Sequence, residues 1–276
     1  MAPTSNATTG DQLDNDHKIE QQWKRNMWNQ QTATQLLYSD DRMIRLKSED
    51  KNGPKVCSVH RALLCLYLPY NDKLLNGGFA EGLVPRIDPL TLETGANILK
   101  LFVAWLYTGQ IIIAPAQPRW YRTITKLYIL AGELNCVALQ RSIISAQPTN
   151  SDHKDLPSFE TIGLLMNSSL ETSGLYHFYV ETYAAHWNGE IDGSLETPDM
   201  EHIVPHKLAY HLLCRTAQVA HNVDYRCACC HDTCKFHGHE SEAERKATCG
   251  GSYAWLEGNQ EELFDSHSDS DSESEL

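Results

Sequence analysis

The sequence predicts an α+β fold, in which a small β-sheet with helical hairpins is followed by an α-helical extension. Two short apolar stretches, at 43–46 and 55–59, flank a turn at 51–54 and are typical of a β-hairpin. The stretch 56–65 then passes from strand to helix and carries apolar residues on several faces, so this helix needs neighbours on several sides. Longer segments with helical periodicity follow at 92–107, 120–134 and 138–146.

Shorter elements complete this first region. Pro69 suits the first turn of a short helix at 70–75. The stretches 83–87 and 111–113 are predicted to be additional short strands. Upstream, residues 1–37 form an N-terminal segment that is expected to be disordered at 1–16. Its part at 17–37 has apolar residues at roughly helical spacing, which is compatible with either a helix or a frayed extension.

The second half of the chain is predicted to be helical and then rich in cysteine and histidine. A linker at 148–157 leads into a helical extension at 158–224, which is too small to predict independent folding. Its apolar periodicity indicates three helices, at 162–169, 175–185 and 203–220.

Charge is unevenly distributed along the chain. The net charge is −13, and the segment 257–276 contains eight acidic residues with no Lys or Arg. This low-complexity acidic tail is predicted to be disordered, and its serines followed by acids are either kinase sites or only a solvating tail. No basic stripe accompanies it, so a nucleic-acid partner is not expected.

Two absences suggest the compartment. The sequence has no apolar run near the ~20 residues of a membrane span. Its first residues lack the basic and apolar regions of a secretory signal. The expected location is the cytoplasm or nucleus, where the nine cysteines stay reduced unless they hold a metal.

The segment 225–249 is predicted to bind zinc, because five of the nine cysteines fall within it. Cys227 and Cys230 have the spacing of a knuckle pair, and Cys234 with His237 or His239 would complete a tetrahedral site. Spare candidate ligands are Cys229, His231 and Cys249. The competing interpretations are a reactive thiol cluster and a bias of composition.

A zinc site of this kind is expected to be structural. The loop between the two ligand pairs is much shorter than the ~12 residues of a nucleic-acid-reading finger, so no recognition helix fits in it. A catalytic site needs an open coordination position and a general base, and nothing in the sequence fixes the nearby Glu240 in that role.

Four short motifs occur in the first region of the chain. They are Tyr38-Ser39-Asp40-Asp41, Val59-His60-Arg61-x-Leu63-Leu64-Cys65, Leu75-Asn76-Gly77-Gly78-Phe79-x-Glu81 and Trp105-Leu106-Tyr107-Thr108-Gly109. In this order and spacing, residues 38–147 resemble a BTB/POZ domain, especially the form common in filamentous-fungal proteins. The resemblance implies a small sheet capped by helical hairpins, with following helices packed onto the domain. Leu68 before Pro69, Asn71 after Tyr70, and Pro85 within an expected strand depart from the family pattern.

The resemblance also implies roles for individual residues. In dimeric BTB domains an aspartate–arginine pair lies near the dimer interface, so an interface or structural role is implied for Asp41, or alternatively Asp40, with Arg61. His60 stands alone between apolar residues, which indicates a structural hydrogen-bonding role. In adaptors of cullin-RING ubiquitin ligases, a triplet like Phe79-x-Glu81 contacts the cullin. The alternative for this triplet is local packing and helix capping.

The function predicted from these features is non-enzymatic protein–protein interaction, through dimerisation or as an adaptor or scaffold. No nucleophile–base–orienter set is present in the BTB-like part, and no small-molecule substrate is expected. The expected partner is a second copy of the chain or a cullin. Alternatives are a cullin-RING substrate adaptor, a zinc-dependent nucleic-acid-binding transcriptional regulator and a metallohydrolase.

Overall fold

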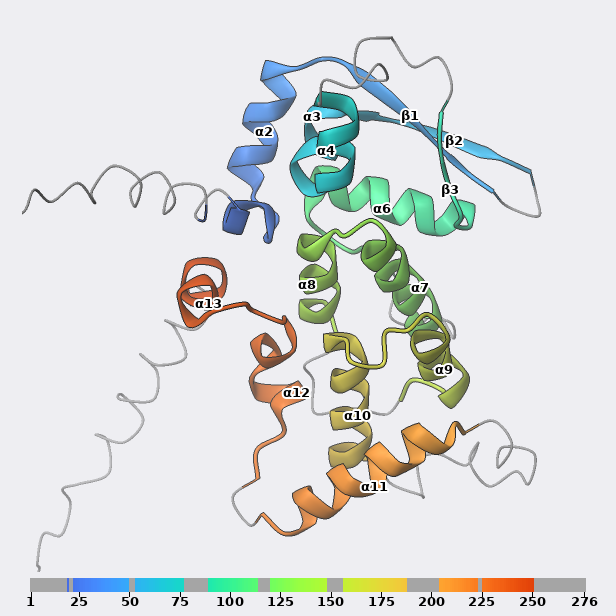
Figure 1. Ribbon diagram of the computed structural model, residues 1–276, viewed down its shortest axis with the longest axis vertical. Coiled ribbons are helices and arrows are strands. Elements are labelled where there is room, and N and C mark those ends of the chain that lie inside the picture. Colours follow the sequence, from blue (N-terminus) through green and yellow to red (C-terminus); the bar gives the residue numbers. More distant parts are fainter. Residues whose placement is uncertain are drawn as a thin grey trace, which may run out of the picture. The chain divides into compact units, whose positions relative to one another are not determined.

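A computed structural model (Figure 1) describes residues 19, 22–49, 53–76, 89–113, 120–147, 156–187, 204–222 and 225–250. The chain divides into two compact units, Met1–Gly238 and His239–Leu276. The expected disordered segment at 1–16, the expected strand at 83–87, the Phe79–Glu81 triplet and the acidic tail at 257–276 lie outside the described residues. No helix within the described ranges has both the length and the apolar character that crossing a membrane requires.

A three-stranded sheet belongs to the first unit. Its strands are β1 (Met43–Ser48), β2 (Lys55–His60) and β3 (Leu90–Leu92), in the order β2-β1-β3. β1 pairs antiparallel with β2 and parallel with β3. Leu46 and Val59 point into the core, where they are 1% and 0% exposed. The predicted hairpin and the α+β class are therefore confirmed.

The third described strand was not predicted. Leu90 and Leu92 are half-buried and Thr91 between them is exposed, which is the alternation of a strand with one face on the core. The sequence assigned Leu92 to the start of a helix, which instead begins at Ala96. The expected strand at 111–113 is wrong, because these residues pair with none of the described strands. Ile111 and Ile113 are half-buried against the core, with no hydrogen-bonded neighbour among the described strands.

Helices of the first unit pack against this sheet and against one another. They are α2 (Gln30–Ser39), α3 (Arg61–Tyr67), α4 (Pro69–Asn76), α6 (Ala96–Thr108), α7 (Trp120–Glu133) and α8 (Val137–Ser145). Helices α3 and α6 pack against β2 of the sheet, and the further helices pack on other elements. α6 carries Trp105, the largest of the fully buried side chains in the described core, and its Phe102 and Leu106 are fully buried as well. It ends at Gly109, whose φ of 67° is the left-handed conformation that favours glycine at a helix C-terminus.

The segment before α2 is fixed to the core by a tryptophan. Trp28 Nε1 donates a hydrogen bond of 3.1 Å to the Leu106 carbonyl oxygen. The backbone N–H of Asn29 donates to the Tyr67 hydroxyl at 3.2 Å, and the Asn29 side chain caps α2. A Cβ added to Gly109 would overlap the indole ring of Trp28, so the absence of a side chain there permits the contact. Of the stretch 17–37, which was predicted to be either a helix or a frayed extension, residues 30–37 belong to α2.

The helical extension packs onto the first region. Its helices are α9 (Phe159–Asn167), α10 (Gly174–His186) and α11 (His206–Ala220). α10 contacts α8, α9 and α11 and is buried on nearly every side (Figure 1). The Tyr179 hydroxyl lies 2.9 Å from Thr125 Oγ1 of α7, and the Tyr183 hydroxyl donates to the Pro157 carbonyl at 2.5 Å. One continuous core therefore joins the sheet region to the extension.

The first unit ends with α12 (Ala228–His231) and the 3-10 helix η3 (Thr233–Phe236). Phe178 of α10 meets the Phe236 ring edge-on, with centroids 5.4 Å apart. Arg141 of α8 is 1% exposed, and its Nε donates to the His237 carbonyl at 3.1 Å. These contacts hold η3 against α8 and α10.

The second unit has one described helix, α13 (Glu242–Cys249). Ser241 caps its N-terminus by accepting a hydrogen bond of 3.1 Å from the Glu244 backbone N–H. The buried Glu244 carboxylate in turn accepts from the Glu240 backbone N–H at 2.7 Å. The arrangement resembles a capping box, except that the Glu244 carboxylate accepts from the residue before the N-cap instead of from Ser241 itself.

Candidate metal centre

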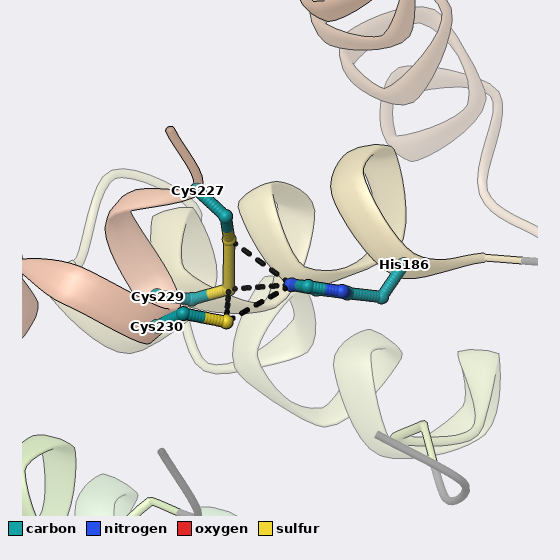
Figure 2. A group of neighbouring side chains, drawn as sticks. All are labelled: His186, Cys227, Cys229 and Cys230. Carbon is teal, nitrogen blue, oxygen red and sulfur yellow. Dashed lines mark hydrogen bonds between the residues drawn. A yellow bond between two sulfur atoms is a disulfide. The ribbon is translucent and has the colours of Figure 1, made fainter. Parts of the chain in front are cut away.

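Three cysteines and one histidine converge at the end of α10 (Figure 2). His186 is the last residue of α10, while Cys227, Cys229 and Cys230 lie at and within α12. One ligand atom from each residue lies within 4.8 Å of the other three. His186 Nε2 is 3.1 Å from Cys227 Sγ and 3.3 Å from the Sγ atoms of Cys229 and Cys230.

This donor set fits zinc. Zinc binds thiolate sulfur at about 2.3 Å and imidazole nitrogen at about 2.0 Å, which places a nitrogen and a sulfur of one tetrahedron about 3.5 Å apart. The nitrogen–sulfur distances of 3.1 to 3.3 Å are slightly shorter than this value. The Sγ atoms of Cys229 and Cys230 are 4.0 Å apart, close to the about 3.8 Å expected for two sulfurs of one tetrahedron. With the cysteines reduced to thiolates, small side-chain movements would bring the four donors to zinc distances.

The local backbone explains why the three sulfurs face one direction. Cys227 stands at the N-cap of α12, and its carbonyl oxygen accepts hydrogen bonds from the backbone N–H groups of Cys230 and His231, both at 3.2 Å. This tight turn is the knuckle that the Cys227-x-x-Cys230 spacing predicted. Cys229 lies inside the same turn. Cys227 and Cys229 are buried, while Cys230 and His186 are half-buried.

Two of the three cysteines are also joined to each other by a covalent bond. Cys227 and Cys229 form a disulfide in the structure (Figure 2). A disulfide between them closes a very small loop and links neither Cys230 nor His186, so it does not tie α12 to α10. A metal ion bound by all four donors would join the two helices. The two states are mutually exclusive, because zinc requires the cysteines as thiolates.

Burial changes the acidity of the centre. In the absence of an ion, desolvation raises the pKa of the Cys230 thiol above its ordinary value. A bound cation acts in the opposite direction and keeps a coordinating thiol deprotonated.

The other predicted ligands lie elsewhere. Cys234 is in η3, and His237 Nε2 is 3.0 Å from Ser145 Oγ of α8, so neither belongs to the group around His186. His231 is exposed on α12. In the second unit, His239 Nε2 and Cys249 Sγ are 3.5 Å apart. The structure thus places His186, which the sequence did not indicate, beside the predicted knuckle pair.

The predicted aspartate–arginine pair does not form. The Asp40 carboxylate binds Arg42, whose Nε and Nη2 donate at 2.7 Å each. The Arg61 guanidinium turns toward α4, where it donates to the Leu75 carbonyl and, at 2.6 Å, to Asn76 Oδ1. Within the described residues no ion pair joins Arg61 to Asp40 or Asp41. The turn at the end of α4 supplies acceptors for Arg61 in place of a carboxylate.

His60 forms hydrogen bonds to a tyrosine of α6. The backbone N–H of His60 donates to the Tyr107 hydroxyl at 3.1 Å, and its Nδ1 lies 2.8 Å from the same hydroxyl. The two rings also meet edge-on, with centroids 5.7 Å apart. These contacts tie the strand–helix junction to α6, which is a structural hydrogen-bonding role.

Comparison with protein-family models, with curated proteins and with solved structures found no match to the chain.

Proposed function

We propose that the chain is a non-enzymatic protein-interaction module of the BTB/POZ type, with a C-terminal extension held by structural zinc. The observation that carries the first part is the order and pairing of elements. A hairpin leads into the helix pair α3–α4, then into a strand parallel to β1, and then into α6 and the helix pair α7–α8. This order supports the proposal, because the resemblance implies a small sheet with helical hairpins.

Exposed groups near the sheet support an interaction role. β2 is an edge of the described sheet, so one side of its backbone is available for pairing. Tyr38 on α2 is 90% exposed, and Met43 and Val56 on the hairpin are 47% and 52% exposed. Together with the edge position of β2, these exposed side chains support a contact with another protein.

The donor set supports a structural role for zinc. His186 and the three cysteines supply four protein ligands, which leaves no open position for a water or substrate in a tetrahedral site. A catalytic zinc keeps such a position. We therefore favour structural zinc over a metallohydrolase, and a clamp between α10 and α12 over a nucleic-acid-reading finger.

Two measurements on the full chain test the interaction proposal. Light scattering after size exclusion, at concentrations up to the high micromolar range, reports whether the chain forms a dimer. Affinity purification from the native cell, with wild type beside the Phe79→Ala/Glu81→Ala double variant, reports whether a cullin is bound through the triplet.

A dimer would support self-association, and a cullin lost from the double variant would support the adaptor alternative. A chain that stays monomeric and retains no cullin would overturn both forms of the proposal. A gel shift with DNA or RNA that weakens steeply with salt would instead favour the nucleic-acid-binding alternative.

A further inference from the structure

A buried carboxylate lies on the same helix as His186. Glu181 of α10 is 4% exposed. It accepts hydrogen bonds from Arg215 of α11, at 2.5 Å from Nε and 2.9 Å from Nη2. The Tyr225 hydroxyl donates to the same carboxylate, as does the backbone N–H of Ala228 at 3.4 Å. Three separate segments therefore meet at one side chain.

This carboxylate is held in its charged form. Burial alone raises the pKa of Glu181, but the hydrogen bonds from Arg215 and Tyr225 outweigh burial, and the net shift is downward. The hydrogen bond to Glu181 also raises the pKa of Arg215. Arg215 lies over the Tyr225 ring, 5.5 Å from its centroid, which adds a cation–π contact. A buried charge with this many partners is costly to disturb.

Ala228 connects the hydrogen-bond network of Glu181 to the metal centre. Ala228 lies between the ligands Cys227 and Cys229, so its N–H anchors the backbone of the knuckle. α10 thus fixes the metal centre twice, by the imidazole of His186 as a ligand and by the Glu181 carboxylate as a backbone anchor. Residues outside the coordination sphere that orient ligands typically change metal affinity by about 10- to 100-fold when they are replaced.

We propose that Glu181 is the positioning residue of the metal centre and that, through Arg215, it makes zinc binding and the attachment of α11 to α10 depend on each other. This inference rests on the proposed zinc site. Coupling between two sites is reciprocal, so a change in α11 that weakens zinc binding implies that zinc strengthens the attachment of α11.

Zinc affinity tests the first half of the inference. The full chain, under reducing conditions, competes for zinc against a coloured chelator, and cobalt(II) spectra identify thiolate ligation. Glu181→Gln removes the charge and keeps the shape, and Arg215→Met removes the partner on α11. Both are expected to weaken zinc binding by about 10- to 100-fold. Tyr225→Phe removes a single hydrogen bond and is expected to have a smaller effect in the same direction, without risking the fold.

Arg122→Gln is the matched control. Arg122 of α7 binds Glu160 of α9 at 2.6 Å, which is another arginine–glutamate pair between helices in the same unit. This pair makes no contact with the metal group, so its loss is expected to leave zinc affinity unchanged. A general loosening of helix packing would instead weaken zinc binding in this variant too.

Hydrogen exchange tests the second half. In the wild type, removal of zinc is expected to accelerate amide exchange in α11 more than in α7 and α8. In Glu181→Gln the exchange of α11 is expected to be fast with or without zinc. A purely structural role for Glu181 would also raise exchange in α11 in this variant, but removal of zinc from the wild type would then leave exchange in α11 unchanged.

The outcomes separate the two proposals. If the wild type binds no zinc, or if His186→Ala binds as the wild type does, the proposed zinc site fails. If the wild type binds zinc through His186 while Glu181→Gln, Arg215→Met and Tyr225→Phe keep its affinity, only the positioning role fails. If the rate of amide exchange in α11 of the wild type is the same with and without zinc, the proposed coupling between zinc binding and α11 fails.

Discussion

His186 Nε2 lies 3.1 Å from Cys227 Sγ, although 41 residues separate the two along the chain. The contact joins the last residue of α10 to the first turn of α12. α10 is packed on the continuous core, whereas α12 is a short helix with little apolar surface of its own. A metal bound at this point would therefore hold α12, near the C-terminal end of the first unit, in a fixed position against α10.

The first prediction concerns the histidine ligand. His186→Ala should remove one zinc equivalent from the purified, reduced chain, because three thiolates remain without their imidazole partner. The loss in affinity should exceed the about 10- to 100-fold that outer-sphere changes cause. Metal analysis and chelator competition measure it.

His231→Ala is the control for that experiment. His231 follows Cys230 directly but is exposed on α12, outside the metal group. Its replacement should leave zinc content at the wild-type level. Equal zinc loss in the two variants would contradict the assignment of His186.

The sequence predicted helices better than it predicted the site. Expected helices at 120–134, 138–146 and 175–185 correspond closely to α7, α8 and α10, because their apolar residues repeat at helical spacing. Leu90–Leu92 was missed, because three residues carry too little periodicity to separate a strand from a helix start. The isoleucines at 111–113 have strong strand propensity, but a strand also needs a neighbour, which propensity cannot supply.

The ligand set illustrates the same limit. Cys227 and Cys230 were recognisable from local spacing alone, since a knuckle is a property of adjacent residues. His186 sits at the end of a buried helix in a different segment, and only tertiary packing brings it to the knuckle. Glu181 was equally hidden, because a lone glutamate on an apolar helix has no spacing partner. Such a glutamate within a buried pattern is nevertheless a signal that a buried cation or N–H partner exists.

Acid should remove the contribution of the Asp40–Arg42 pair. Hydrogen bonds from Arg42 are the largest cause that lowers the pKa of Asp40, from 3.8 to about 2. A lowered carboxyl pKa stabilises the fold above the unfolded value, and this stabilisation is lost as the pH falls through about 2. The stability difference between wild type and Asp40→Asn should therefore be small, constant above about pH 4, and shrink below it.

Urea unfolding at several pH values, with chelator present throughout, measures this difference. Asp41→Asn is the control, because Asp41 forms no ion pair within the described residues. Its replacement should change the free energy of unfolding by less than about 0.5 kcal/mol. A difference for Asp40→Asn that grows as the pH falls would contradict the role of the pair.

Trp28 should hold the N-terminal segment to the core. Trp28→Ala removes the indole packed against Gly109 and the hydrogen bond to Leu106. Because Trp28 is half-buried, we expect a loss of about 2 kcal/mol in the free energy of unfolding, below the range for fully buried tryptophan. Limited proteolysis should cut near α2 sooner than in the wild type.

Tyr38→Ala is the matched control on the same helix. Tyr38 is 90% exposed, so its removal should change stability by less than about 0.5 kcal/mol. Early cleavage near α2 in both variants would show that α2 is loosely held regardless of Trp28.

Gly174 should be intolerant of a side chain. It is the first residue of α10, and a Cβ added there would overlap the Phe236 carbonyl oxygen of η3 and lie 3.0 Å from Ile144 Cδ1. The carbonyl belongs to the backbone and cannot rotate away as a side chain would. Gly174→Ala should therefore push η3 away from α10 and cost about 2 kcal/mol of unfolding free energy, as overpacking does in cores. Gly163→Ala in α9 makes the same chemical change where an added Cβ meets nothing within 4 Å. It should stabilise the chain by up to about 1 kcal/mol, because alanine favours a helix interior over glycine.

Denaturant unfolding gives the free energy of unfolding of both variants. Equal stabilisation by both substitutions would refute the close packing of α10 on η3.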